Sequence, residues 1–159
     1  EFFCTTYFPH YMTHAEKSDL HEYLFCRLPE IAESPESCSD VIGAPRGEAK
    51  STICTQLHTL WRIVTGRTHF ALIVMDSIDQ AYPMLETIKA ELEFNSRLAM
   101  DFPQACGAGK TWQAGSIITA NNIKVCVAGS GKKLRGMRFG PYRPDLVVLD
   151  DIEFQHTAA

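Results

Sequence analysis

The spacing of apolar positions along the first half of the chain predicts two helices with a strand between them. Leucines at every fourth position predict an amphipathic helix over residues 12–28, followed by a loop rich in Pro, Ser and Glu. The short apolar run in DVIGAP predicts a buried strand at residues 40–42. Apolar residues then recur at helical spacing over residues 51–66, and Gly66 is a suitable C-terminal cap.

The second half continues the alternation of strands and helices. HFALIVMD (69–76) is apolar throughout, as in a parallel strand covered on both faces. Ser77 is an expected N-cap, and the helix after it is predicted to run to about Asn95. SIITANNIKVCVAG (116–129) predicts two strands joined across consecutive asparagines, and PDLVVLDDIE (144–153) predicts a buried strand that ends in acids.

This order of elements predicts an α/β fold. Strands that alternate with helices form a largely parallel central sheet with helices packed on it, because the crossover helices must bury their apolar faces. We therefore expect one domain over residues 1–159, a three-layer sandwich with a β-hairpin insertion.

The composition is that of an ordinary globular protein, with 45% hydrophobic and 21% charged residues. No apolar run approaches the roughly 20 residues that span a bilayer, and no signal-peptide pattern is seen, so we expect no membrane partner and an intracellular location. Six cysteines without a C-x-x-C pair predict reduced thiols. The formal net charge is −4, yet residues 102–144 contain seven Lys and Arg and no acid. That segment suits a phosphate partner or a solvated surface balanced by acids elsewhere.

Three segments combine glycine with lysine as phosphate-binding loops do: GAPRGEAKST (43–52), GAGKT (107–111) and GSGKK (129–133). A phosphate loop needs a buried strand before it and a helix directly after it, because the helix N-terminus supplies free amides and a favourable dipole. GAGKT lacks both neighbours, and GSGKK lacks the hydroxyl residue that would bind Mg²⁺. Only residues 43–52 lie between a predicted strand and a predicted helix.

The segment 43–52 departs from the G-x-x-x-x-G-K-[ST] pattern, because Ala44 and Ala49 occupy its two glycine positions. Alanine is tolerated where φ is negative, so we expect Gly47 to supply the single positive φ. Lys50 is predicted to reach the β- and γ-phosphates and Ser51 to bind Mg²⁺. The competing interpretation is a strand-loop-helix corner with an incidental lysine. The predicted nucleotide-binding residues are Gly43, Ala44, Pro45, Arg46, Gly47, Glu48, Ala49, Lys50, Ser51 and Thr52.

Acidic residues follow the last predicted strand. Four apolar residues (146–149) end in Asp150 and Asp151, and Glu153 lies two positions further on. A carboxylate at the end of a parallel strand can orient the water shell of Mg²⁺, while a second acid polarises the attacking water. Asp150 is therefore the second predicted metal ligand. Together with the loop, these acids predict a site for a nucleoside triphosphate.

The quoted segments, with SIDQAYPMLETIKAELEFN and VAGSGKKLRGMRFGPYRPDLVVLDDIE, resemble the large subunit of the tailed-phage terminase, the motor that packages viral DNA into empty capsids. The resemblance begins at about Asp40 and implies a P-loop NTPase fold. It implies that Arg46 contacts the γ-phosphate or signals its loss. It also implies that Asp151 is the catalytic acid, with Glu153 as fallback.

The arginine of the LRG segment, Arg135, resembles the one that some members offer to the nucleotide of a neighbouring subunit. Arg138 is a second candidate for that role. The alternative for Arg135 is a contact to a phosphate backbone or a place on the surface.

The same resemblance implies an ATP-hydrolysing motor with ATP and Mg²⁺ as cofactors. Its implied partners are double-stranded DNA, the terminase small subunit, the portal and, at full length, other copies in a ring. The implied location is the cytoplasm of an infected bacterial host, or of a host that carries the gene in a prophage. A coupling strand and a nuclease domain are further implied, so we expect a truncated ATPase domain that binds nucleotide weakly and packages nothing alone.

Two other classes of protein stay open from the residues alone. One is a P-loop helicase or translocase, and the other is a non-hydrolysing scaffold that binds nucleotide through a degenerate loop. Among the aromatic residues, Tyr7, Phe8 and Tyr11 could stack on adenine, with a core or surface position as the alternative for each.

Overall fold

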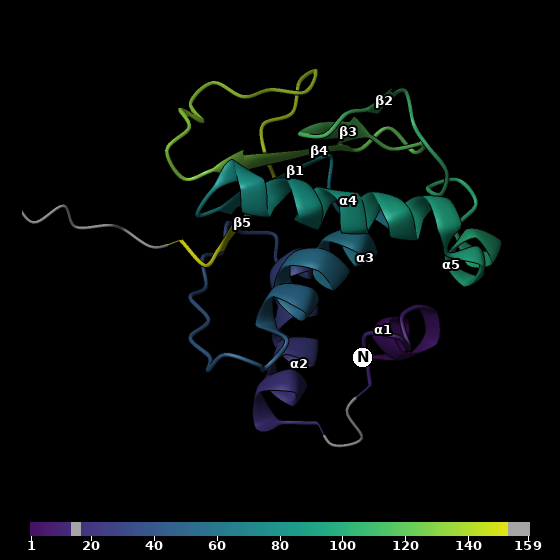
Figure 1. Cartoon of the computed structure of the whole chain (residues 1–159), viewed down its shortest axis with the longest axis vertical. Coiled ribbons are helices and arrows are strands. Elements are labelled where there is room, and N and C mark those ends of the chain that lie inside the picture. The colour runs from purple at the N-terminus through teal and green to yellow at the C-terminus, as the bar shows by residue number, and fades with distance from the viewer. Residues whose placement is uncertain (14–16, 153–159) are drawn as a thin grey trace, which may run out of the picture.

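The computed structural model describes residues 1–13 and 17–152, and it contains one five-stranded sheet with the strand order β2-β3-β4-β1-β5 (Figure 1). The three strands β4 (Lys124–Gly129), β1 (Phe70–Met75) and β5 (Leu146–Asp150) run parallel. Two short strands extend the sheet beyond β4: β3 (Ser116–Ile118) pairs antiparallel to β4, and β2 (Thr111–Trp112) pairs antiparallel to β3. The predicted α/β class, the parallel strands and the hairpin at 116–129 are confirmed.

The central position of β1 explains why its sequence is apolar throughout. Ala71 and Ile73 lie in the main core on one face of the sheet, whereas Phe70, Leu72 and Val74 pack on the other face. A strand covered on both faces needs no polar alternation.

Strand β5 was predicted to be buried, and this is wrong in part. It lies at the edge of the sheet, where Val147 and Leu149 remain 51% and 65% exposed. Its first residue, Leu146, and its last, Asp150, are buried.

Helices cover one face of the sheet. Helix α4 (Ile78–Phe94) begins after the cap residue Ser77, as predicted, and packs on β1 and β4. Beside it the chain forms a π-helix, η1 (Ser51–Leu57), that continues into α3 (His58–Val64). The short helices α1 (Phe2–Tyr7) and α5 (Ser96–Asp101) close the end of this layer. Apolar side chains from all five helices form the main core with the sheet.

The other face of the sheet is covered by the β4–β5 connection, residues 130–145, and not by helices in the described part of the chain (Figure 1). Leu134, Met137 and Phe139 of this connection pack against the apolar side chains of β1. The predicted third, helical layer is therefore not observed. The physical reason is local: the connection is rich in glycine, proline and basic residues and has no apolar period of 3.6 that would form a helix face.

Helix α2 (Asp19–Glu33) starts later and ends later than predicted. Ser18 caps its first turn, and the helix continues through Pro29 for a further turn that was predicted as loop. Leu24 and Leu28 are buried against Ile53 of η1, so the predicted leucine stripe is the packing face.

The predicted strand at residues 40–42 is absent. These residues form no β pairing, and Val41 is fully exposed. The segment is held by α2 instead: the Arg27 guanidinium donates from Nε (2.8 Å) and Nη2 (3.2 Å) to the Asp40 carboxylate. A segment of three residues is too short for its sequence pattern to distinguish a strand from an extended loop. The contacts with α2 determine that residues 40–42 form an extended loop.

Asp145 joins the starts of β1 and β5. It accepts hydrogen bonds from the Thr68 hydroxyl and from the amides of His69 (2.8 Å) and Phe70 (3.0 Å). Burial alone would raise the pKa of Asp145, but these hydrogen bonds favour the carboxylate and bring the pKa below its usual value.

All six cysteines are free thiols, as predicted. Among the residues that the structure describes, no helix has the length and apolarity that a membrane crossing needs.

Candidate functional site

The segment 43–50 turns sharply before η1 begins at Ser51, beside the end of β5. Gly47 has φ of +93° and Ala49 has φ of +51°, whereas Lys50 is right-handed helical with φ of −51° and ψ of −53°. The expectation that Gly47 alone would have a positive φ is wrong. Ala49 adopts the left-handed region as well, at a cost of about 1–2 kcal/mol for a residue with a Cβ. It occupies the position where the usual pattern has glycine.

The backbone of this loop presents unused hydrogen-bond donors. The amides of Gly47 and Ala49 donate to no acceptor in the described part of the chain. A left-handed residue followed by a right-handed one turns successive amides toward the same side, which forms a concave anion site. The loop therefore has, at the start of η1, the alternation of backbone conformations that is typical of an anion-binding nest.

The side chain of Asp150 lies against the first turn of η1. Ser51 Oγ donates to Asp150 Oδ1 at 3.0 Å, and Thr55 Oγ1 donates to Asp150 Oδ2 at 2.8 Å. Asp150 is only 4% exposed and Thr55 only 1%, so these bonds are shielded from water. Residues 99 positions apart in sequence are thus brought together at one edge of the sheet.

The π-helical form of η1 fits this contact. Ser51 and Thr55, four positions apart, reach the two oxygens of the same carboxylate. π-helical segments are rare and occur often at functional sites.

The paired oxygens of Ser51 and Asp150 suit Mg²⁺. A hydroxyl and a carboxylate oxygen lie within 3.0 Å of each other, so these two residues could hold one Mg²⁺, which prefers oxygen ligands. No group of three or more His, Cys, Asp or Glu side chains converges anywhere in the described residues. Mg²⁺ needs no such group, because it keeps several waters and takes its remaining ligands from substrate phosphates.

Lys50 lies at the junction of loop and helix, and it is half-buried without an ion-pair partner in the described residues. Its charge reaches the neighbouring Cys54. Burial raises the pKa of the Cys54 thiol to about 11, the Asp150 charge raises it further, and Lys50 opposes the shift. Cys54 is therefore a neutral thiol that packs beside the site and not a nucleophile.

The other predicted site residues make no hydrogen bond to Ser51 or Asp150 in the described part of the chain. Arg46 and Asp151 are exposed, and Asp151 follows β5 with φ of +51°. Arg135 is exposed on the β4–β5 connection, and neither arginine forms an ion pair in the parts of the chain that are described. Glu153 lies outside the described residues. The remaining loop residues lie around the turn, from exposed to half-buried: Gly43, Ala44, Pro45, Glu48 and Thr52.

Sequence reasoning missed two residues that contact this site. Thr55 was foreseeable, because it follows Ser51 by four positions on a predicted helix and so shares its face. His21 was not: its Nε2 lies 3.0 Å from the carbonyl oxygen of Glu48, across 27 positions of sequence that carry no signal of the contact.

The two other glycine–lysine segments lie elsewhere, as expected. In GAGKT, a Cβ on Gly109 would lie 1.7 Å from the carbonyl oxygen of Ile118, so this glycine lets the backbone approach β3 closely. GSGKK follows β4 and leads into the irregular connection and not into a helix. Neither segment precedes a helix N-terminus that could bind phosphate.

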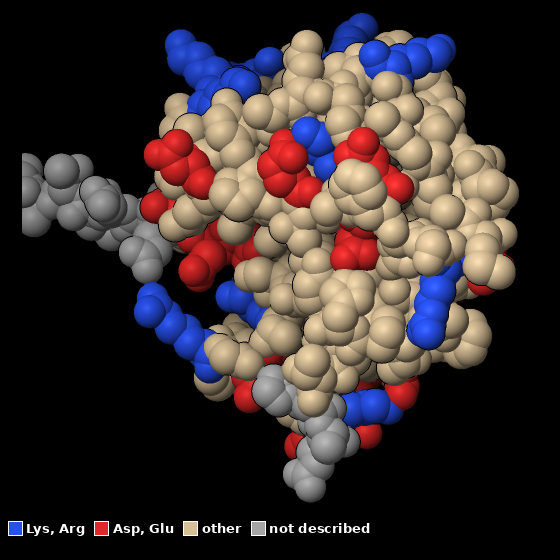
Figure 2. All heavy atoms as spheres, turned by 45° about the vertical axis from the view of Figure 1, so that its right-hand side comes forward, with Lys and Arg blue, Asp and Glu red and all other residues tan. Residues whose placement is uncertain are grey.

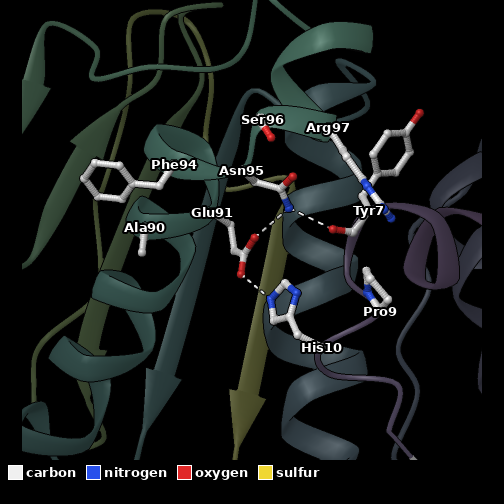
Figure 3. Close-up of a pocket in the computed structure, with 9 residues that line it drawn as sticks. All are labelled: Tyr7, Pro9, His10, Ala90, Glu91, Phe94, Asn95, Ser96 and Arg97. Atoms are coloured by element: carbon white, nitrogen blue, oxygen red, sulfur yellow. Dashed lines mark hydrogen bonds and ion pairs between the residues drawn. The ribbon is translucent and has the colours of Figure 1, made fainter.

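A surface pocket of about 410 Å³ lies near the C-terminal end of α4 (Figure 3). His10 Nε2 contacts Glu91 Oε1 at 2.7 Å, and Asn95 Nδ2 donates to Glu91 Oε2 and to the carbonyl of Tyr7, both at 2.8 Å. These bonds attach the N-terminal segment to α4. Helix α4 starts next to the site edge of the sheet and is about 25 Å long by its 17 residues, so the pocket is distant from Asp150.

The aromatic residues considered for adenine stacking are mostly core residues. Phe8 is fully buried and Tyr7 is 8% exposed, and both belong to the main core. Tyr11 packs against that core from its border.

Comparison with protein-family models, curated proteins and solved structures found no significant match to this chain.

Proposed function

We propose that this chain is the ATP-hydrolysing domain of a viral DNA-packaging motor of the terminase large-subunit type. In this proposal the domain has a P-loop NTPase fold and couples ATP hydrolysis to translocation of double-stranded DNA into a procapsid. The observation that carries it is the contact of Ser51 and Asp150 beside a loop with free amides. Amides that could donate to phosphate and two oxygens that could bind Mg²⁺ at the end of a parallel strand support this proposal.

The chain's own residues would divide the work as follows. The loop amides and Lys50 bind the phosphate oxygens, and Ser51 with Asp150 holds Mg²⁺, which neutralises charge on the phosphates when it is bound. Asp151, or Glu153 as the second choice, orients and deprotonates the attacking water. Arg46 neutralises charge on the transferred group in the same subunit, and Arg135 does so toward a neighbouring one.

The distribution of charge supports a nucleic-acid partner. The β4–β5 connection carries exposed basic residues on the sheet face opposite the helices, anchored by its apolar residues. In the view of Figure 2, basic side chains project at the upper margin and at several other places around the edge, and acidic ones lie near the centre and at the lower margin. The exposed basic residues of the connection suit a phosphate backbone despite the net charge of −4. The exposed basic residues of the connection are Lys132, Lys133, Arg135, Arg138 and Arg143.

The small subunit, the portal, a ring of copies and the cytoplasm of an infected host belong to the same proposal. They follow from the proposed motor activity.

Equilibrium binding of a fluorescent ATP analogue, with and without Mg²⁺, tests the nucleotide site. Lys50→Ala is expected to weaken binding about 10-fold or more, since charge-assisted bonds to phosphate are lost. Lys110→Ala is the matched control, because it removes the lysine of the rejected GAGKT segment and should leave binding unchanged. Equal binding by wild type and Lys50→Ala would remove the proposed site.

Hydrolysis and DNA binding test the motor itself. Asp151→Asn should retain ATP binding and lose turnover measured with duplex DNA present. Duplex affinity should fall with salt, and Lys133→Ala or Arg135→Ala should each reduce the slope of log K against log salt by about 1. Lys17→Ala, outside the connection, should not change it. A slope that none of these variants alters would exclude the connection as the DNA-binding surface.

A second candidate is a domain that binds nucleotide without hydrolysing it. It is favoured by the absence of a strand before the loop, where Val41 is fully exposed, and by the strained Ala49. Mg²⁺-dependent binding that Lys50→Ala abolishes, with no turnover at any DNA concentration, would favour this candidate over the motor.

A further inference from the structure

Residues 40–48, which lead into η1, are held by contacts to helix α2. At the start of this segment, Asp40 is bound by Arg27, and Ile42 packs against the Leu24, Leu28 and Ile53 cluster. At its end, His21 contacts the Glu48 carbonyl at 3.0 Å. Because residues 40–42 pair with no strand, α2 supplies contacts that a strand would otherwise provide.

The hydrogen bonds of His21 define which ring nitrogen carries the proton. The Ser18 amide donates to His21 Nδ1 at 3.5 Å as part of the capping box of α2. Nδ1 is therefore the acceptor, and Nε2 carries the proton that is donated to the Glu48 carbonyl. One ring thus links the helix start to the loop backbone.

This bond also sets the direction of the next amide. In a trans peptide the carbonyl of one residue and the N–H of the next point in opposite directions. With the Glu48 carbonyl directed at α2, the Ala49 N–H points away from α2, and it donates to no acceptor in the residues described. The positive φ at Gly47 and at Ala49 permits this peptide orientation.

We infer that His21 is a positioning residue for the phosphate loop: by holding the Glu48 carbonyl, it aims the Ala49 amide into the concave side where phosphate would bind. The role of this amide in binding rests on the proposed function, but its orientation does not. His21 itself touches no nucleotide in this arrangement.

Two substitutions separate the two bonds of the ring. His21→Asn keeps an acceptor near the position of Nδ1, which preserves the helix cap, but it is too short to reach Glu48. His21→Gln places an amide donor near the position of Nε2, which preserves the bond to the loop but removes the cap partner. If His21 had only a structural role, the loss of nucleotide affinity in each variant would parallel its loss of folding stability.

Amide spectra of the ¹⁵N-labelled chain without nucleotide, urea unfolding and the Kd for Mg·ATP give the readouts. His21→Asn is expected to shift the Ala49 amide resonance, lower the unfolding midpoint by no more than His21→Gln does, and raise Kd about 3- to 10-fold, the range for one lost hydrogen bond. His21→Gln should keep the resonance and a Kd within about twofold of wild type, with a lower unfolding midpoint.

An unchanged Ala49 resonance and Kd in His21→Asn would overturn the inference, as would equal loss of affinity in both variants. If the resonance behaves as expected but the wild type does not bind Mg·ATP, the positioning of the loop stands and the proposed function fails.

Discussion

The bond from Thr55 to Asp150 offers the sharpest test of the site geometry. Thr55→Val keeps the shape of the side chain and removes only the hydroxyl that donates to Asp150 Oδ2 at 2.8 Å. Because both residues are buried, water cannot replace the lost donor. The carboxylate would keep Ser51 as a donor and have one oxygen without a partner.

The expected loss of stability follows from the charge of the acceptor. A hydrogen bond to a charged group contributes about 1.5–3 kcal/mol, so Thr55→Val should lower the free energy of unfolding by about 2 kcal/mol. Thr55→Ser is the matched control: it keeps the hydroxyl and removes one buried methyl, which costs about 1 kcal/mol. Both variants should therefore be less stable than wild type. Thr55→Val loses the hydrogen bond, whereas Thr55→Ser loses only the packing of a methyl group.

A double-mutant cycle with Asp150→Ala separates those reasons. Without the carboxylate, Thr55→Val has no bond to break, so the coupling energy should be about 2 kcal/mol, whereas the cost of Thr55→Ser should be the same in both backgrounds. Urea unfolding followed by circular dichroism, with unchanged m-values, measures each corner of the cycle. A coupling energy below about 0.5 kcal/mol for Thr55→Val would refute the contact.

Three further predictions concern the parts of the fold that support the site. Burial lowers the pKa of His58 from 6.5 to about 4. As the pH falls from 6.5 to 4, the histidine is protonated in the unfolded chain but not in the folded chain, so the free energy of unfolding should fall by about 3 kcal/mol. The free energy of unfolding of His58→Leu should not change in this way over the same pH range. The lowered pKa of Asp145 acts in a more acidic window. Asp145→Asn should cost about 1–2 kcal/mol at pH 7. Its difference from wild type should begin to shrink as the pH falls to the unfolded pKa of 3.8 and should disappear only below the lower pKa of the folded chain, which acid titration of both unfolding curves would show. Gly109→Ala would place a Cβ 1.7 Å from the Ile118 carbonyl oxygen, so it should cost about 1–3 kcal/mol of stability and lower the melting temperature. Gly131→Ala, with open space around its Cβ, should melt as wild type does. Equal melting temperatures for the two variants would contradict the close approach.

The elements with a long and regular pattern could be predicted from the sequence. The apolar run of β1, the capped helix α4 and the hairpin at 116–129 carry local signals that tertiary packing agrees with. The identity of Ser51 and Asp150 as a pair was also predictable in kind, because the ends of parallel strands and the start of the next helix meet at one edge of the sheet.

What only the tertiary structure decided is how the loop is held. DVI could pair as a strand or lie along a helix, and the contacts of α2 determined the second outcome. The positive φ of Ala49 and the bond from His21 to Glu48 likewise depend on how the loop packs against α2. The sequence by itself determined the helices and strands with long, regular patterns and the side chains suited to bind phosphate and Mg²⁺, because those properties are local. Pairing across many residues depends on which surfaces bury each other best, and that is a property of the whole packed chain.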